Sequence, residues 1–173
     1  MTVAPKTRAV IVGTGIFGMS TALWMLEDGG YEVVMLDKCD TLPAPDAAST
    51  DLNKIIRASD YADPALASLA LEAVHLWRKP EWDNTLHESG FIALSRSGDA
   101  SAQAFVTKAF ANSKNLGTGV TLTPDGASIK AFVTDVPTGG FGGREGYYNP
   151  MGGWAEAGRA VEVGHERIRK TVS

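Results

Sequence analysis

Apolar runs and glycine turns alternate over the first 37 residues of the chain. An apolar, β-branched run at 8–12 ends at a glycine and is typical of a buried parallel strand. Apolar residues then recur at helical spacing over 16–28, and two consecutive glycines end that segment. A second apolar run over 31–37 ends on an acidic residue. Strand, glycine turn, helix and strand in this order predict a βαβ unit.

The rest of the chain carries weaker patterns. Residues 40–60 are rich in Pro, Ala, Ser and Asp and predict a long ordered loop with a short central segment at 53–57. Residues 117–146 are dominated by Gly, Thr and Pro, so few strands are expected there. Apolar spacing predicts these further elements: a helix that starts at Asp63-Pro64 and ends before Pro80, a strand at 91–95, a helix at 100–112, a short apolar element at 129–133 and a helix at 154–168.

Composition and charge argue against several classes of protein. At 173 residues the chain is long enough for one domain with a hydrophobic core. A net charge of −4 without a basic run argues against a nucleic-acid partner. Because Cys39 is the single cysteine, no intramolecular disulfide can form. No Cys/His cluster has metal-ligand spacing either, so no metal site is expected.

Nothing in the sequence predicts membrane association. The longest apolar runs, such as 9–12 and 33–36, are far too short to span a bilayer, and residues 1–8 lack an apolar signal segment. The last three residues are not a peroxisomal tripeptide. We therefore expect a cytoplasmic location, or a peroxisomal one if the native C-terminus lies beyond Ser173. The sequence does not indicate an oligomeric state.

The strongest motif is the glycine turn between the first strand and the first helix. Gly13, Gly15 and Gly18 form G-x-G-x-x-G, and Asp37 closes the next strand 24 positions after Gly13. The first glycine permits the tight turn, the second lets a pyrophosphate approach the helix N-terminus, and the third allows close packing of helix and strand. Asp37 is then placed to accept hydrogen bonds from a ribose diol.

Glycine turns also occur in α/β domains that bind no nucleotide. Here the strand, the helix and the terminal acid all agree, and this agreement favours a dinucleotide site. An acid at the end of the second strand disfavours a 2′-phosphate and therefore NADP. The motif alone leaves FAD and NAD open.

Three blocks of sequence, residues 10–37, 48–57 and 148–157, resemble the fungal fructosyl amino acid oxidases, or amadoriases. These enzymes are related to sarcosine oxidase, saccharopine oxidase and the D-amino acid oxidase superfamily, and they run to more than twice this length. The resemblance implies FAD as cofactor and an N-terminal portion of such an enzyme. The predicted fold class is then α/β: a discontinuous FAD-binding Rossmann-type domain with a parallel sheet, over 1–60 and 145–173, and part of an inserted α+β substrate domain over 61–144.

The resemblance also implies roles for individual residues. Lys54 corresponds to a basic residue close to the flavin ring and is the candidate catalytic residue, and Arg57 corresponds to an arginine that faces the substrate carboxylate. If 53–57 were helical, both side chains would share a face, and a guanidinium suits a carboxylate. The alternative is that Lys54 and Arg57 are solvated cations in a loop and have no functional role. The candidate cofactor-binding residues are Gly13, Gly15, Ile16, Phe17, Gly18, Asp37, Lys38, Ser49, Thr50, Asp51, Asn53 and Lys54. Of these, the residues at 49–51 could equally be turn formers.

The cysteine, the histidines and Trp154 are weaker candidates for a functional role. The resembled enzymes attach FAD through a cysteine of their C-terminal half, whereas Cys39 lies near the expected adenosine end, so we expect a packing residue. His75, His87 and His165 are expected to be structural or exposed, and Trp154 is expected in the core.

The function implied is oxidation of the C–N bond of a secondary amine by hydride transfer to flavin, with O2 reduced to H2O2. Fructosyl amino acids, sarcosine-like N-methyl amino acids, saccharopine or pipecolate, and N-methylated intermediates of secondary metabolism all fit a carboxylate held by arginine beside an oxidisable amine. One alternative is a nucleotide-binding module without oxidase activity. Another is a piece of an NAD-dependent dehydrogenase, against which the block at 48–57 argues. Without a second half, apolar surface is expected to be exposed.

Overall fold

The computed structural model describes residues 5–133 and 140–172. The chain divides into two compact units. The first unit holds residues 1–54, 79–85 and 155–173, and the second holds residues 55–78 and 86–154.

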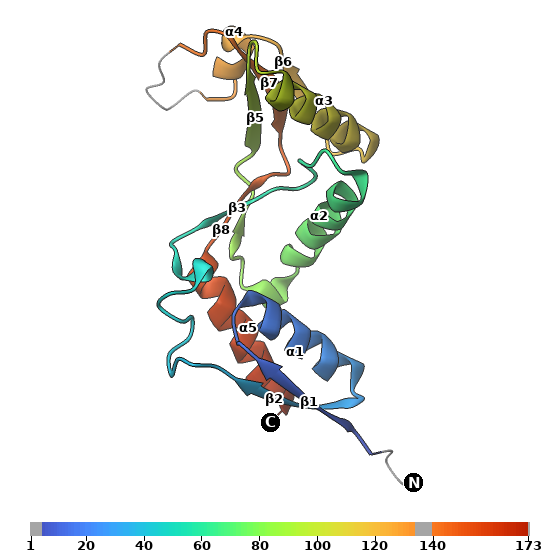
Figure 1. Cartoon of the computed structure of the whole chain (residues 1–173), viewed down its shortest axis with the longest axis vertical. Coiled ribbons are helices and arrows are strands. Elements are labelled where there is room, and N and C mark those ends of the chain that lie inside the picture. Colours follow the sequence, from blue (N-terminus) through green and yellow to red (C-terminus); the bar gives the residue numbers. More distant parts are fainter. Residues whose placement is uncertain (1–4, 134–139, 173) are drawn as a thin grey trace. The chain divides into compact units, whose positions relative to one another are not determined.

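The first unit is built on a parallel pair of strands (Figure 1). β1 (Thr7–Val12) pairs in parallel with β2 (Tyr31–Leu36) along its whole length. α1 (Ile16–Asp28) connects the two strands and has the bounds that its apolar spacing predicted. Gly29 ends α1 in the left-handed conformation, with φ 80°, which a glycine adopts without steric cost. The predicted βαβ unit is confirmed.

The last helix, α5 (Ala157–Val172), packs on α1 (Figure 1). Gly164 makes this approach close, because a Cβ there would lie 2.0 Å from the sulfur of the fully buried Met19. Arg167 adds an ion pair with Glu27 at 3.1 Å. The end of the chain is thereby fixed to the same unit as the glycine turn.

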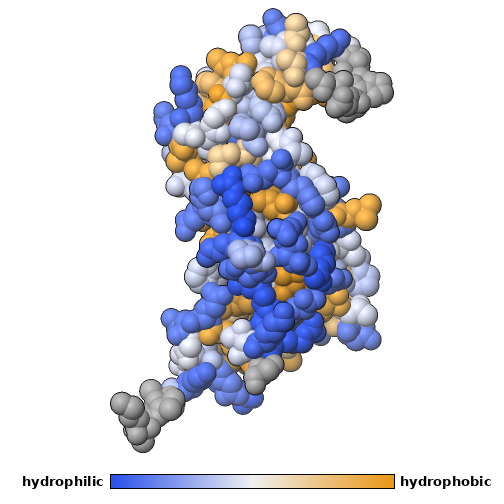
Figure 2. Space-filling view, turned by 180° about the vertical axis from the view of Figure 1, so that it is seen from behind, coloured by the Kyte–Doolittle hydropathy of each residue, from blue (hydrophilic) through white to orange (hydrophobic). Residues whose placement is uncertain are grey.

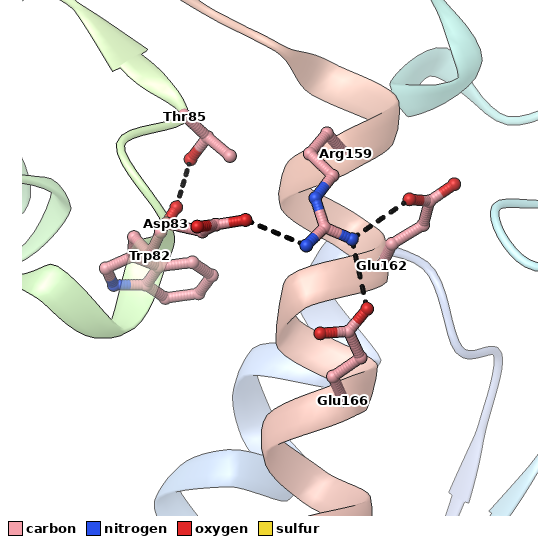
Figure 3. A network of polar contacts seen from close by, with 6 residues as sticks. All are labelled: Trp82, Asp83, Thr85, Arg159, Glu162 and Glu166. Atoms are coloured by element: carbon pink, nitrogen blue, oxygen red, sulfur yellow. Dashed lines mark hydrogen bonds and ion pairs between the residues drawn. The ribbon is translucent and has the colours of Figure 1, made fainter.

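Arg159 of α5 ties segment 79–85 into the first unit (Figure 3). Its guanidinium donates to Asp83 at 2.8 Å, to Glu166 at 3.0 Å and to Glu162 at 3.3 Å. The hydrogen bond with Asp83, followed by those with the two glutamates, raises the pKa of Arg159 further above its usual value. Three carboxylates therefore hold one cation at the start of α5.

The second unit contains an antiparallel sheet of order β5-β7-β6, in which β7 is central. α3 packs against β5 and β7, and the core between them holds Ala93, Val106, Ala109 and Tyr147. A second sheet has the order β3-β8-β4, and the first residue of β3 and the last residue of β8 are counted in the first unit. The elements not yet bounded are η1 (Ala48–Thr50), β3 (Lys54–Ile56), α2 (Pro64–Trp77), η2 (Pro80–Trp82), β4 (Leu86–His87), β5 (Phe91–Arg96), α3 (Ala100–Asn115), β6 (Thr121–Thr123), α4 (Gly126–Lys130), β7 (Arg144–Asn149) and β8 (Gly153–Ala155).

Helix α2 follows its sequence signals closely. The side chain of Asp63 accepts hydrogen bonds from the backbone N–H groups of Ala65 and Leu66, at 2.8 and 3.0 Å, and Pro64 occupies the first turn. The strand predicted at 91–95 is also confirmed, as β5. α3 begins where predicted and continues to Asn115.

The segment at 53–57 contains the strand Lys54–Ile56 and no helix, so the condition under which Lys54 and Arg57 would share a face is not met. One expectation about the start of an element is wrong. The helix predicted from Trp154 begins at Ala157, because the preceding residues form β8. Trp154 instead stacks on His87, with ring centroids 4.1 Å apart.

Few strands were expected in 117–146; among its described residues this range holds the short β6 and the start of β7, a strand that the sequence did not predict. Gly146 of β7 faces the backbone of Ala93, where a Cβ would lie 1.8 Å from the carbonyl oxygen. Gly146 is therefore a position where two strands approach closely, and not a turn residue. The short apolar element expected at 129–133 is α4, which starts earlier at a capping box of Asp125 and Ser128.

The compact units divide the chain after residues 54, 78, 85 and 154. The FAD-binding domain over 1–60 and 145–173 and the insert over 61–144 stay predictions. Which residues contact FAD stays a prediction.

The first unit exposes apolar side chains on its strands and on the first turn of α1. The exposed fractions are 84% for Val12, 57% for Val10, 52% for Leu36 and 88% for Phe17. Figure 2 shows one face of the molecule, on which separate apolar areas lie between hydrophilic residues. Such exposure was expected from the sequence. Across 5–133 and 140–172, none of the helices has the length and apolar character needed to cross a bilayer.

Candidate functional site

The glycine turn joins the end of β1 to the start of α1. Gly13 has φ +96°, and its N–H donates to the carbonyl of Leu36 at 2.7 Å. Gly18 lies against this turn: a Cβ there would lie 1.9 Å from the carbonyl oxygen of Gly13. A Cβ on Gly15, by contrast, would meet no atom of the chain within 4 Å. Two glycines shape the turn, and the third leaves open space at the N-terminus of α1.

Asp37 is held against the turn by Thr14. Its Oδ2 accepts hydrogen bonds from the Thr14 N–H at 2.6 Å and the Thr14 hydroxyl at 2.9 Å, and its Oδ1 accepts one from the Cys39 N–H at 3.1 Å. These bonds, led by the one from the Thr14 N–H, lower the pKa of Asp37 to about 2. Asp37 is exposed, so a carboxylate oxygen there can also accept a hydrogen bond from an outside donor such as a sugar hydroxyl.

Titration of Asp37 provides a first test. The pKa in the folded chain, about 2, is below the ordinary value of 3.8, so the folded state favours the ionised carboxylate. The stabilisation is fully present above about pH 4 and is lost as the pH falls towards about 2. NMR titration of the Asp37 carboxyl carbon should give a midpoint near the lower value. A midpoint near 3.8 would contradict the hydrogen bonds from Thr14. Asp37→Asn should remove this part of the acid sensitivity of unfolding.

A pocket of about 160 Å³ opens beside the turn. Thr14, Gly15, Asp37 and Ser49 line it, together with the loop at 42–47. Lys38 also lines it and forms an ion pair with Asp46; their hydrogen bond raises the pKa of the lysine and lowers that of the aspartate. The pocket is smaller than the usual small-molecule site of about 300 to 1,000 Å³, so it can enclose only part of a dinucleotide.

The structure brings four predicted cofactor residues, Gly15, Asp37, Lys38 and Ser49, around this one pocket. Ile16 and Phe17 are exposed on the first turn of α1. Thr50 ends η1, and Asp51 and Asn53 are exposed beyond it. Lys54 forms an ion pair with Asp51 and does not line the pocket.

Arg57 belongs to the second unit and borders a different pocket, of about 430 Å³. Phe91 and Phe105 contribute apolar walls to this pocket, and Arg57 contributes a cation. The guanidinium also lies over the ring of Tyr61, 5.6 Å from its centroid. A cation beside an apolar wall can bind a carboxylate attached to an apolar group.

A buried polar cluster, missed from the sequence, supports the segment that carries Arg57. Asp60 is 1% exposed and accepts from the Asn149 side-chain amide at 3.1 Å. Burial, followed by the nearby charge of Asp60, raises the pKa of Tyr147 far above its usual value. Ser59 bonds to Ser113 of α3 at 2.8 Å. These residues are all buried, and no sequence spacing joins Asp60 to Asn149, 89 positions away.

Residues 8–170 match the model of the DAO family, described as FAD dependent oxidoreductase. The chain belongs to the DAO family. FAD is therefore its cofactor, which decides between the two dinucleotides that the glycine turn left open.

The names of individual relatives agree with this assignment. L-saccharopine oxidase of Schizosaccharomyces pombe is 38% identical over 85 residues, which are 49% of this chain and 19% of that protein. Amino acid oxidase fsqB of Aspergillus fumigatus is 26% identical over 186 residues, covering 88% of this chain and 37% of that protein. A modified fructosyl peptide oxidase from Aspergillus nidulans, crystallised in complex with FSA, has a TM-score of 0.77 and 26% identity, covering 97% of this chain and 40% of that chain. This chain spans two fifths or less of each relative, and the α/β fold class is confirmed.

Proposed function

We propose that the complete protein oxidises the C–N bond of a secondary amine or an N-substituted amino acid, with O2 reduced to H2O2. The observation that supports this proposal most is the glycine turn. The open space at Gly15 suits the pyrophosphate of ADP, and the ionised Asp37 suits the ribose hydroxyls. Bound FAD would supply the acceptor for two electrons and a proton. The proposal rests further on the family and on names of relatives, which are amino acid and fructosyl peptide oxidases.

The residues of the first unit would hold the cofactor. The N–H groups at the start of α1, beginning with Gly15, would present their partial positive charge to a pyrophosphate. The Asp37 carboxylate would accept a hydrogen bond from a ribose hydroxyl. Lys38 and Ser49 line the pocket into which the ribose would extend. Lys54, paired with Asp51, would add a positive charge towards the flavin end, as the sequence resemblance implies.

Arg57 would bind the carboxylate of the substrate in the second unit. The pocket beside it has room for a small amino acid, since about 430 Å³ falls within the usual range for small molecules. Its aromatic walls would exclude water from the apolar part of the substrate.

Arg57→Lys tests this assignment, because lysine keeps the charge and loses the planar fork of donors. In the complete protein KM for an N-substituted amino acid should rise about tenfold, the loss expected for one charge-assisted hydrogen bond. The kcat should change less. Arg96→Lys is the matched control, since Arg96 is exposed in the same unit and does not line the pocket. Equal KM values for both variants would place the carboxylate elsewhere.

Peroxide release is the direct test of the proposed reaction. The complete protein would be assayed for H2O2 with sarcosine, other N-methyl amino acids, pipecolate, saccharopine and a fructosyl amino acid. Peroxide with at least one of them is expected. A protein that binds flavin and releases no peroxide with any of them would be a binding module, and the oxidase proposal would fail.

A further inference from the structure

Thr14 is held from two directions, at its N–H and hydroxyl by Asp37 and at its carbonyl, which belongs to the peptide with Gly15, by His165. Asp37 accepts from the N–H and the hydroxyl of Thr14, as described above. On the other side, the carbonyl oxygen of Thr14 lies 2.9 Å from Nε2 of His165, on α5. Both residues are almost fully buried, with 6% exposure for Thr14 and 7% for His165. The glycine turn is thus fixed by a residue 151 positions away.

The direction of the bond to His165 follows from its acceptor. A carbonyl oxygen only accepts hydrogen bonds, so Nε2 of His165 must carry the proton and donate. This assigns the Nε2–H form of the imidazole. A buried carbonyl that loses its donor is left unsatisfied, so an apolar residue of the same size would not replace the histidine.

The bond also sets where the next N–H points. In a planar trans peptide the C=O of one residue and the N–H of the next point in opposite directions. With the Thr14 carbonyl turned towards His165, the Gly15 N–H points away from that side chain. We propose that His165 is a positioning residue, which holds the Thr14–Gly15 peptide so that the Gly15 N–H is presented to the pyrophosphate of the cofactor. This inference rests on the proposed use of the turn for FAD.

The effect on binding follows from preorganisation. Without the donor on α5, the peptide can rotate, and the orientation that binds the cofactor becomes one of several. The apparent affinity for the cofactor is then the intrinsic affinity multiplied by the fraction of molecules whose peptide is in the competent orientation. His165 therefore acts on the cofactor through the turn, and touches no part of it.

Three substitutions separate this role from general packing. His165→Gln places an amide N–H near the position of Nε2 and should bind FAD within about twofold of the unchanged chain. His165→Asn carries the same amide on a shorter side chain that does not reach Thr14, and His165→Leu carries no donor. Both should weaken FAD binding about tenfold, the effect of one lost hydrogen bond to a buried carbonyl.

The dissociation constant of FAD would be measured by fluorescence titration of each chain, with melting temperatures taken alongside. Rescue by Gln and weakening by Asn and Leu support the inference. The inference is overturned if His165→Leu binds FAD as tightly as the unchanged chain does. It is also overturned if His165→Gln weakens FAD binding as much as His165→Leu does.

A readout without ligand separates this inference from the proposed function. In the unliganded chain, ¹⁵N NMR of His165 should show a protonated Nε2, and the Gly15 amide signal should move in the Asn and Leu variants and much less in the Gln variant. If neither FAD nor ADP binds the unchanged chain, the use of the turn for FAD fails, while these signals still report whether His165 positions the peptide. A Gly15 amide that is unmoved in all three variants sinks the positioning role by itself.

Discussion

Gly15→Ala is expected to remove most of the FAD affinity while leaving the fold intact. A Cβ at this position meets no atom of the chain within 4 Å, and its φ of −66° and ψ of −171° suit alanine. The methyl group would instead occupy the space into which a pyrophosphate must come to reach the N–H groups of α1. Loss of charge-assisted hydrogen bonds there should weaken binding about 10- to 100-fold.

Titration with FAD and a thermal melt would check both halves of this expectation. The melting temperature should fall only modestly, because the added Cβ meets no atom of the chain, although alanine is poorer than glycine as the residue that precedes a helix. Gly142→Ala is the matched control: its Cβ also meets nothing within 4 Å, and it lies in the second unit. Unchanged FAD binding in Gly15→Ala would place the cofactor away from the turn.

Gly18→Ala should show the opposite pattern, with a large loss of folding stability. Its Cβ would lie 1.9 Å from the carbonyl oxygen of Gly13 and 3.1 Å from the side chain of Ile11. The first of these atoms is backbone at the end of β1, so relief requires α1 to move away from the strand. Overpacking of this kind costs about 3 kcal/mol or more.

Urea unfolding of the chain would measure the cost, and Gly15→Ala serves as its control because both variants add the same methyl group. A Gly18→Ala chain as stable as the Gly15→Ala chain would contradict the close contact of α1 with the turn. The pair of variants thus separates the glycine that shapes the turn from the glycine that leaves room for a ligand.

The fold could be predicted from the sequence where local signals agree with each other. The βαβ unit carries alternating strand and helix periods, a terminal glycine and a terminal acid, and its bounds were right almost to the residue. β7 was missed because Gly146 in its middle looks like a turn residue, whereas its missing side chain is required by the backbone of Ala93 across the sheet. The start of α5 was placed too early because Trp154 fits a strand as well as a helix.

The candidate site was predictable to the extent that it lies in one stretch of chain. The glycines and Asp37 are joined by a motif with fixed spacing, and the pocket forms beside them. His165 and Asp60 were not predicted as contributors, because their partners lie 151 and 89 positions away and no periodicity links such residues. Lys54 and Arg57 would share a face only in a helix, and the segment forms a short strand.

A ¹H–¹⁵N NMR titration of the chain with FAD, and separately with ADP, would test most directly whether the glycine turn holds the ADP part of the cofactor. Both ligands should shift the amide signals of Gly15 and Ile16, at the start of α1, and the signal of Asp37. The Gly15→Ala chain should show these shifts only at much higher ligand concentration. Shifts confined to other parts of the chain, or tight binding of FAD with an unmoved Gly15 amide, would contradict the site described.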